Sequence, residues 1–532
     1  MDLYEGRQQI MNNGISRDSS LQKLRSLVQF FNSFTLPLAM VSSIYIPSSI
    51  TIWKTLAVCA SLLISIVIFS FSNQHTSLRS NFFHVTTRQS SVPQDTTNVS
   101  HLVFGLLGSV KTWHYRKPFI ESWWRPNITR GYVYLDRAPT DDLLPWVGNY
   151  PPFRISDDNT KLLEESKHVS ALMVRMVHAV IEVFREEREG VRWYIMGDDD
   201  SIFFVDNLVD ELSKYDHTKY IYIGAHSECV LSNQFFSYDM GFGGAGLIMS
   251  YPLAKMVQKN IEDCFKRYPY LRSADLILMI CVNDFGVSLT VHQGLHQTNN
   301  LNKEKKLINF NFENFEIKSY MDLRGDASGF LSAHPKAPLL SLHHLEHVDP
   351  IFRSMDRFES LKHLMKAADV DQPRLLQQTI CHSRQLNWSF SISWGYSVHI
   401  YENIASRSIL KTPLETFRPW GNWKPPLYIF NTRPVLSNDP CATPHVFTFQ
   451  SIKKNNGIEV ITNYSRMASR GLPTCGLAGN NSADSVSRIE VVSPLKKPTQ
   501  NGKTECCDVV GIDGLEVARL KLRDCMDDEL IA

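Results

Sequence analysis

Hydrophobic and polar positions follow different patterns in three parts of the 532-residue chain. Residues 55–71 are apolar all round, with no charge and no proline. Between about residues 99 and 370, short apolar runs alternate with stretches in which apolar residues recur every three or four positions, the spacing of a helix face. From residue 380 to 532 the spacing changes to two, which is typical of strands. The sequence therefore predicts one apolar helix, one mixed domain and one β-rich domain.

The middle region predicts an α/β fold. Apolar residues keep helical spacing over 169–184, and the short apolar runs at 192–196 and 220–224 have the length of strands. Another helix is expected over 116–126, and Asp206 is expected to cap the N-terminus of a further one. Strands that alternate with helices predict a mostly parallel sheet with helices on both faces.

Residues 380–532 predict an antiparallel β domain. From Trp388 to Ile400, large apolar residues alternate with serine, glycine and histidine. Later strand-like segments are separated by proline-rich turns, as is common in antiparallel sheets. The region also contains six of the ten cysteines, which suits a cross-linked domain.

The apolar run at residues 55–71 favours a membrane-spanning helix over a core helix, because it has no polar stripe. More Lys and Arg residues precede this run than follow it closely, which predicts that residues 1–54 are cytosolic. Residues 72–98 are rich in Ser, Thr, Asn and Gln and predict a flexible stem. The N-x-Ser/Thr sequons all follow the apolar run and agree with a lumenal C-terminal portion. They are Asn98, Asn127, Asn387, Asn463 and Asn480.

Composition narrows the classes of function. The formal net charge is +1, and the chain has no long basic tract, so nothing indicates binding to nucleic acid. The cysteines form no CxxC pair, which argues against a zinc ribbon or a thioredoxin site. Nine of the ten cysteines come after residue 200, which indicates disulfides in a secretory compartment, although their spacing does not determine the pairs.

Three consecutive carboxylates, Asp198, Asp199 and Asp200, end the strand-like run that begins at Trp193. Adjacent like charges repel, and the repulsion is poorly screened at the end of a sheet. A hard divalent cation relieves it, since Mg²⁺ and Mn²⁺ prefer oxygen ligands. Ligands of open α/β sheets bind beyond the carboxyl ends of the strands, so the triplet predicts a metal site there. The alternative is a solvated acidic turn.

A glycine-rich segment follows at residues 240–257, where Gly243 and Gly244 would let the backbone approach a ligand closely. It is neither a dinucleotide-binding GxGxxG motif nor a Walker loop, because the required flanking residues are missing. The alternative is a glycine-rich turn without a ligand.

Asp275 heads an apolar helical stretch, and Asp284 lies near the end of that stretch. An acid at the start of a helix is commonly a capping or dipole residue. The functional alternative is a general base that faces the cleft at the sheet end, for which Asp284 is the weaker candidate.

Histidines cluster after a late apolar run, at His343, His344 and His347. Imidazoles in this position predict a metal ligand, with a surface histidine run as the alternative. The oxygen-rich triplet favours Mn²⁺ or Mg²⁺ over zinc.

Together these motifs resemble the Fringe-related branch of the family 31 glycosyltransferases, and most of all its plant Fringe-like group. WYIMGDDDSIFF resembles the strand and DxD-type motif, YIYIG the strand after it, and GFGGAGLIMS the Gly-Gly-Ala-Gly segment. SADLILMICVNDFGVSLT resembles the segment with the catalytic acid, and LLSLHH the late metal-binding histidine. The likeness covers roughly residues 100–350, and its specificity lies in the order of the pieces.

The resemblance implies a GT-A fold, a UDP-sugar donor, dependence on Mn²⁺ (or Mg²⁺) and inversion at the anomeric carbon. It also implies a Golgi membrane protein of type II, with a single anchor and a lumenal catalytic domain that transfers sugar to a hydroxyl of a glycan or glycoconjugate. The C-terminal β domain has no counterpart in Fringe.

The resemblance also assigns roles to individual residues. Asp200, Asp198 and His343 would bind the metal, with His344 as the substitute for His343. Asp275 would be the catalytic base. The donor would be bound through four residues: Asp198, Asp199, Gly243 and Gly244.

Two alternatives remain open from the sequence. The first is a non-catalytic Golgi protein that keeps the glycosyltransferase fold as a sugar-binding or scaffold module. The second is a metal-dependent phosphohydrolase, because acidic triplets also bind Mg²⁺ in such enzymes. The predicted anchor, the sequons and the glycine-rich segment favour the transferase over the phosphohydrolase.

Overall fold

The computed structural model describes residues 96–146, 148–297, 323–334, 337–419, 428–479, 481–495, 505–513, 516–526 and 528–529. The predicted cytosolic segment, the predicted spanning helix, the stem up to residue 95 and the sequon at Asn480 lie outside these residues. In the part of the chain that the structure describes, no helix combines the length and the apolar character needed to cross a membrane.

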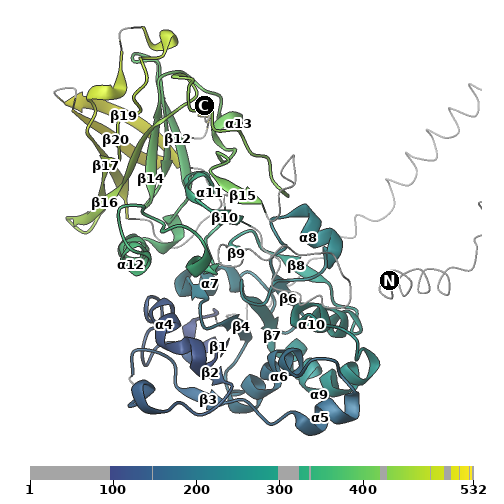
Figure 1. The fold of residues 1–532 in the computed structure, drawn as a ribbon. Helices are drawn as coiled ribbons and strands as arrows, with labels where there is room; N and C mark the ends of the chain where they lie inside the picture. The colour runs from purple at the N-terminus through teal and green to yellow at the C-terminus, as the bar shows by residue number, and fades with distance from the viewer. Residues whose placement is uncertain are drawn as a thin grey trace, which may run out of the picture. The chain divides into compact units, whose positions relative to one another are not determined.

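A seven-stranded sheet forms the centre of the first part of the chain (Figure 1). Its strands, in spatial order, are β3 (Phe153–Ile155), β2 (Arg130–Leu135), β1 (Leu102–Leu107), β4 (Trp193–Asp198), β7 (Leu247–Ser250), β6 (Tyr222–Gly224) and β8 (Leu289–Val291). Every neighbouring pair is parallel except the two pairs that β7 forms, with β4 and with β6. The prediction of a mostly parallel sheet is therefore confirmed, with β7 as the one reversed strand.

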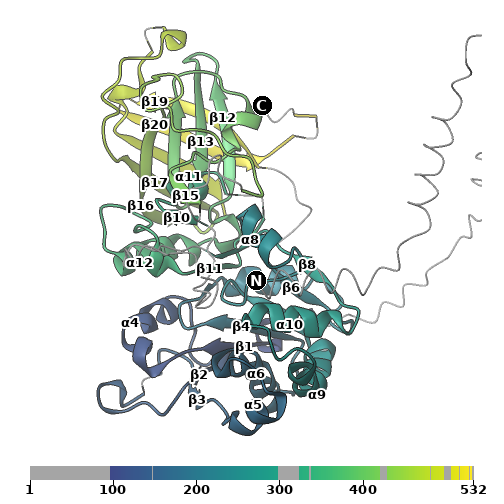
Figure 2. The ribbon, with the colours of Figure 1, turned by 45° about the vertical axis from the view of Figure 1, so that its right-hand side comes forward.

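Helices cover both faces of this sheet. They are α4 (Val110–Glu121), α5 (Thr160–Ser166), α6 (Ala171–Glu186), α7 (Val205–Leu212), α8 (Val230–Phe235), α9 (Tyr251–Arg267) and α10 (Ala274–Asn283). Figures 1 and 2 show α5, α6, α9 and α10 gathered on one side, where α6 contacts β1, β2 and β4 and α9 contacts β4 and β7. A disulfide between Cys264 and Cys281 joins α9 to α10.

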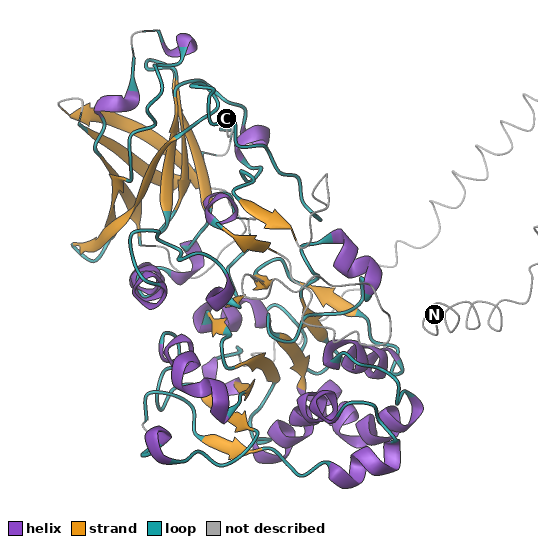
Figure 3. Ribbon diagram, viewed as in Figure 1, coloured by secondary structure: helices purple, strands orange, loops and turns teal. Residues whose placement is uncertain are grey.

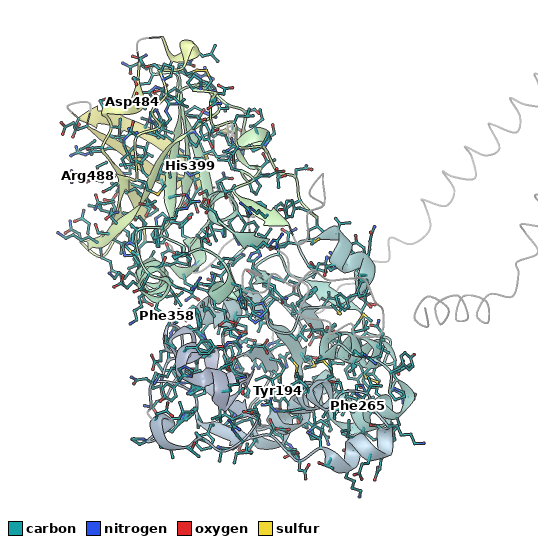
Figure 4. All side chains as sticks on the ribbon, viewed as in Figure 1. Tyr194, Phe265, Phe358, His399, Asp484 and Arg488 are labelled. Atoms are coloured by element: carbon teal, nitrogen blue, oxygen red, sulfur yellow. A yellow bond between two sulfur atoms is a disulfide. The ribbon has the colours of Figure 1, made fainter. Side chains whose placement is uncertain are left out.

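The alternation of side chains along β1 separates two cores. Leu102, Phe104 and Leu106 belong to the cluster on the α4 and α7 side, whereas Val103 belongs to the cluster with α6, α9 and α10. In the second cluster Tyr194, labelled in Figure 4, packs against the ring of Phe184. The first cluster does not end at this sheet, because the same group of buried side chains continues into the C-terminal sheet.

A small sheet brings two distant segments to the end of β4. Its strands are β5 (Ile202–Phe203), β11 (Ser341–His343) and β9 (Leu295–Gln297), with β11 in the middle. Ser341 pairs with Phe203 of β5 and with Leu295 of β9. This pairing places the end of β11 beside the acidic triplet. A two-stranded sheet pairs β10 (Leu323–Gly325), which precedes the C-terminal strands in the chain, with β15 (Phe417–Pro419), which comes after several of them.

The C-terminal part is an eight-stranded sheet, and Figure 3 shows that strands dominate it. In spatial order its strands are β12 (Gln378–Ser383), β13 (Trp388–Ser393), β14 (Ser397–Tyr401), β16 (His445–Asn455), β17 (Glu459–Arg466), β18 (Arg488–Pro494), β20 (Val517–Asp524) and β19 (Glu505–Asp513). All pairs are antiparallel except β18 with β20, which confirms the predicted antiparallel region. Three short helices accompany it: α11 (Ser328–Ser332), α12 (Arg357–Ala368) and α13 (Arg407–Leu410).

The two edge strands of this sheet approach each other, because a disulfide between Cys381 and Cys507 joins β12 to β19. Cys441–Cys475 and Cys506–Cys525 form two further disulfides. The expectation of disulfides in this region is confirmed. The spacing of the cysteines in the sequence did not predict which of them would pair.

The alternating run from Trp388 to Ile400 divides into two strands, β13 and β14, joined by a turn in which Gly395 has φ +74°. Its serines are buried as well as its apolar residues. Ser393 Oγ donates to the carbonyl of Leu331 at 2.7 Å, and Ser397 Oγ lies 2.8 Å from Ser332 Oγ. Helix α11 therefore covers the face that an alternating pattern alone would leave exposed.

Two helix-start predictions are wrong. Helix α4 begins at Val110, earlier than the expected residue 116, with Ser109 as its N-cap. Asp206 does not cap α7: it lies in the first turn and forms an ion pair with Arg125 at 2.6 Å. The side chain of Gln372 accepts hydrogen bonds from the N–H groups of Asp206 (2.9 Å) and residue 207 (3.1 Å) instead. A cap from so distant a residue leaves no local sequence signal.

Candidate functional site

The acidic triplet lies at the carboxyl end of β4, where the sequence predicted it. Asp198 is the last residue of β4 and pairs with Leu107 of the parallel strand β1. Ser201 fixes the turn that follows: its Oγ accepts from the N–H of Asp198 at 2.8 Å and donates to the carbonyl of Gly244 at 2.6 Å. The hydroxyl of Ser201 thus connects the triplet to the glycine-rich segment.

Asp199 points toward α4. It forms an ion pair with Arg116 at 2.7 Å and accepts a hydrogen bond from the Thr112 hydroxyl at 3.1 Å. Burial raises the pKa of Asp199 to about 7, against the opposing effect of Arg116. Its predicted role in donor binding stays a prediction, and the contacts that the structure gives it are with α4.

Asp200, the last residue of the triplet, lies close to two histidines. His343 Nε2 lies 3.2 Å from Asp200 Oδ1 and 3.4 Å from Asp198 Oδ2, and His344 Nε2 lies 4.0 Å from Asp200 Oδ2. Asp200 is completely buried, yet its Oδ2 forms no hydrogen bond. Burial disfavours the charged carboxylate, but His343, His344 and Arg116 outweigh that effect and lower the pKa of Asp200.

The donor set at this position fits a divalent cation. Asp200, His343 and His344 offer ligand atoms within 4.8 Å of one another. Carboxylate oxygens with imidazole nitrogens suit Mn²⁺ and related transition cations. The buried Asp200 Oδ2 that lacks a hydrogen bond is the atom that such a cation would satisfy.

Arg116 and Glu346 belong to this site although the sequence analysis missed both. The Arg116 guanidinium pairs with Asp199 and with Glu346, and its Nη2 lies 3.5 Å from Asp200 Oδ2. His347, the third residue of the histidine cluster, lies 3.0 Å from Glu346 Oε1. Arg116 carries no local signal because α4 reaches the triplet only in the folded chain. Glu346 comes two residues after His344, within the histidine cluster, and could have been found from that position.

The two predicted glycines are needed for close packing at the site. Gly243 donates its N–H to Asp275 Oδ1 at 3.1 Å, and a Cβ atom there would lie 2.6 Å from that oxygen. A Cβ atom on Gly244 would collide with the imidazole ring of His343. Side chains at these positions would displace the groups that carry the chemistry.

Asp275 lies in the first turn of α10, whose N-cap is Ser273, and lines a cavity together with Asp198 and His343. Its side chain is half-buried, and desolvation raises its pKa to about 7, with a further contribution from Asp198. Asp284 lies at the other end of α10, where it pairs with Arg267 at 2.6 Å. The structure therefore places Asp275, and not Asp284, at the cleft.

A cavity of about 250 Å³ connects these groups. Its polar lining includes Asp198, Asp275, His343 and His344, and Gly243 and Gly244 also line it. The apolar lining residues include Leu107, Met176, Val177, Val180, Met196, Leu247 and Leu278. Such a cavity has room for a cation and a small polar group next to the half-buried carboxyl group of Asp275.

The family model that matches this chain covers residues 232–307 and 318–507, which together make up half of it. The chain belongs to the family described as "Protein of unknown function, DUF604". The matched segments include Gly243, Gly244, Asp275 and His343, together with most of the C-terminal sheet, and begin after the acidic triplet. The narrower resemblance to the Fringe-related branch stays a prediction.

A comparison with curated proteins gives no match. Among solved structures, the crystal structure of mouse xyloside xylosyltransferase 1 in its apo form is similar to part of the chain. The sequence identity is 14% and the TM-score is 0.24, over 36% of this chain and 84% of the other.

Proposed function

We propose that this chain is a glycosyltransferase that transfers a sugar from a UDP-sugar to a hydroxyl group of a glycan or glycoconjugate, with inversion and with Mn²⁺ or Mg²⁺. The observation that carries the proposal is the convergence of Asp198, Asp275 and His343 on one cavity at the carboxyl end of β4. These residues come from three distant segments, and each has a role in sugar transfer.

Asp198, Asp200 and His343 would hold the divalent cation in this reaction. The cation, when bound, supplies Lewis-acid stabilisation of the negative charge that develops on the diphosphate leaving group. Arg116 keeps Asp199 and Asp200 in place through its ion pairs. Gly244 leaves room for the His343 ring beside Asp200.

Asp275 is the candidate base. Its carboxylate would take the proton of the acceptor hydroxyl as that oxygen attacks the anomeric carbon. The bond between the anomeric carbon and the diphosphate oxygen breaks, and UDP leaves with the electron pair. A pKa of about 7 suits this role, because the carboxylate is then both substantially ionised and basic near neutral pH.

The location of the enzyme is also part of the proposal. Four disulfides in the described residues support a secretory compartment. Of the sequons, Asn98 and Asn127 are exposed in the structure, as glycosylation requires. We propose a Golgi membrane protein of type II with the described residues in the lumen.

The test is hydrolysis and transfer with a panel of UDP-sugars, using the purified full chain with Mn²⁺ and with EDTA. Slow, Mn²⁺-dependent release of UDP from one donor is the expected result. Asp275→Asn should remove transfer but spare UDP binding, and the matched control Asp284→Asn, on the same helix, should keep activity. Release of phosphate without a sugar acceptor would favour a phosphohydrolase. Donor binding without turnover on any acceptor would favour the non-catalytic module.

A further inference from the structure

A second group of potential metal ligands lies away from the acidic triplet, on α6 and on the loop after β3. Asp157, His178 and Glu182 offer ligand atoms within 4.8 Å of one another. His178 and Glu182 are four residues apart in α6 and therefore share one face of the helix. Asp157 comes two residues after the end of β3. The group thus joins a loop of the sheet edge to the helix that covers it.

The contacts within this group are close. His178 Nδ1 lies 3.1 Å from Glu182 Oε1 and 3.8 Å from Asp157 Oδ2. The N–H of Asp157 donates to Glu182 Oε1 at 3.2 Å. The carboxylate of Asp157 also forms an ion pair with Arg185. His178 and Glu182 are buried, whereas the side chain of Asp157 is 39% exposed and gives access from solvent.

Two buried oxygens beside the group lack hydrogen bonds. Glu182 is 3% exposed, and its Oε2 forms none. Tyr134 is 1% exposed, and its hydroxyl forms none either. Burial, and next to it the charge of Glu182, raise the pKa of Tyr134, so the hydroxyl lies within electrostatic reach of that carboxylate. A buried polar atom without a partner costs about 1–3 kcal/mol, which points to a ligand at this position.

We propose that Asp157, His178 and Glu182 bind a divalent transition cation such as Zn²⁺ or Mn²⁺. One imidazole with two carboxylates suits these cations. Ligand atoms about 2.0–2.2 Å from a metal are roughly 3.0–3.5 Å apart in octahedral or tetrahedral sites. The separation of 3.1 Å between His178 and Glu182 meets that requirement, and the exposed Asp157 carboxylate needs to shift by a few tenths of an ångström.

The cation at this second site is structural. One turn before His178, Arg175 donates to the carbonyls of Gly108 and Tyr134, each at 2.8 Å, at the ends of β1 and β2. A cation on the same helix would fix α6 against the loop after β3 and thereby steady that edge of the sheet. It supplies no group to the cavity of the acidic triplet. The competing explanation is a water molecule between Glu182 and Tyr134, with Arg185 as the only cation at Asp157.

The test counts bound metal in the full chain with the first site removed. The background is Asp200→Asn with His343→Gln, stripped with a chelator and dialysed against Zn²⁺ or Mn²⁺. Elemental analysis should find one equivalent of metal, and adding His178→Gln should reduce it to none. The matched control is Glu186→Gln, on the same helix and paired with Arg154 at 3.2 Å, which should keep the equivalent. The metal should also raise the melting temperature only where His178 is intact.

Two results would overturn the proposal: no bound metal in the background, or an unchanged equivalent after His178→Gln. If His178→Gln does not fold, Asp157→Asn replaces it, because this partly exposed residue tolerates substitution better. A Co²⁺-loaded background should show visible absorption bands that disappear in Asp157→Asn. Bands that persist unchanged would contradict the site, and bands that are absent from the start would favour the bridging water.

Discussion

Among the described residues, the buried carboxylates Glu402 and Asp200 each lie next to histidine and arginine, but their hydrogen bonding differs. In the C-terminal sheet, Glu402 accepts hydrogen bonds on both oxygens: from the N–H of Ala483 (2.8 Å) and the ring of His445 (3.0 Å) on one, and from the N–H of Cys475 (2.7 Å) and Arg470 (2.9 Å) on the other. At the triplet, Asp200 has similar neighbours, yet its Oδ2 accepts none. A buried carboxylate with both oxygens hydrogen-bonded stabilises a fold, whereas one with an unsatisfied oxygen is available to bind a ligand.

Asp200→Asn tests the cleft side of this comparison most severely. The substitution keeps the size of the side chain but removes a charged ligand, so metal-dependent turnover should fall by more than about 100-fold. The melting temperature without metal should also fall, because Asp200 no longer pairs as an anion with His343 and Arg116. UDP release with Mn²⁺ and thermal unfolding without Mn²⁺ measure the two effects. Full activity of the Asp200→Asn variant would contradict the proposed role of the metal.

Glu402→Gln tests the other carboxylate. Losing one partner of a buried ion pair leaves Arg470 without an anion, which costs about 3–5 kcal/mol in the free energy of unfolding. Chemical denaturation measures the loss, and metal affinity at the cleft should be unchanged. The control is Glu490→Gln, whose pair with Arg519 at 3.5 Å is partly exposed and contributes under about 1 kcal/mol. Equal losses in the two variants would mean that burial of Glu402 has no special weight.

Gly244→Ala sharpens the comparison without changing any charge. The new Cβ would meet the His343 ring, so His343 must move away from Asp200. Metal affinity should fall about 10- to 100-fold, the range found when groups that orient a ligand are disturbed. Calorimetric titration with Mn²⁺ gives the value. Gly476→Ala, where the added Cβ meets nothing within 4 Å, should leave affinity unchanged.

The most gradual expected effect is the acid sensitivity of the C-terminal sheet. Burial lowers the pKa of His399 to about 3, below the ordinary value of 6.5 in the unfolded chain. The unfolded state therefore binds more protons, and stability falls as pH drops from about 6.5 toward 3, by up to about 1.4 kcal/mol per pH unit. Unfolding curves from pH 7 to 4 should be flatter for His399→Gln. Parallel curves for the two proteins would assign the acid sensitivity to other buried groups, such as His445.

The sequence alone predicted those structural features that depend on residues close together in the chain. The helix around Val177, the strand that ends at Asp198 and the positions of Asp275 and His343 followed from periodicity, from glycine placement and from family resemblance. The reversed strand β7 did not, because parallel and antiparallel strands have the same side-chain period. Arg116 and Gln372 were missed for a related reason: each acts on a segment more than eighty residues away, and only the folded chain brings them together.

The family resemblance found in the sequence left the C-terminal sheet unexplained. Likeness to the Fringe-related branch stopped near residue 350, whereas the family match runs on to residue 507. The matched segments thus join Asp275 and His343 to strands that the resemblance left without a role. The burial of serines along β13 could not be predicted, since it depends on α11, a helix that precedes these strands by more than fifty residues.

The shared core has a practical consequence for producing this protein. Leu361 and Leu364 of α12 belong to the same buried cluster as Phe390 and Trp394 of the C-terminal sheet, and His363 bonds to the carbonyl of Phe449 at 2.9 Å. A chain shortened at residue 370 would expose this surface and aggregate, however complete its acidic triplet. The smallest portion worth expressing for activity therefore includes the strands as far as β20.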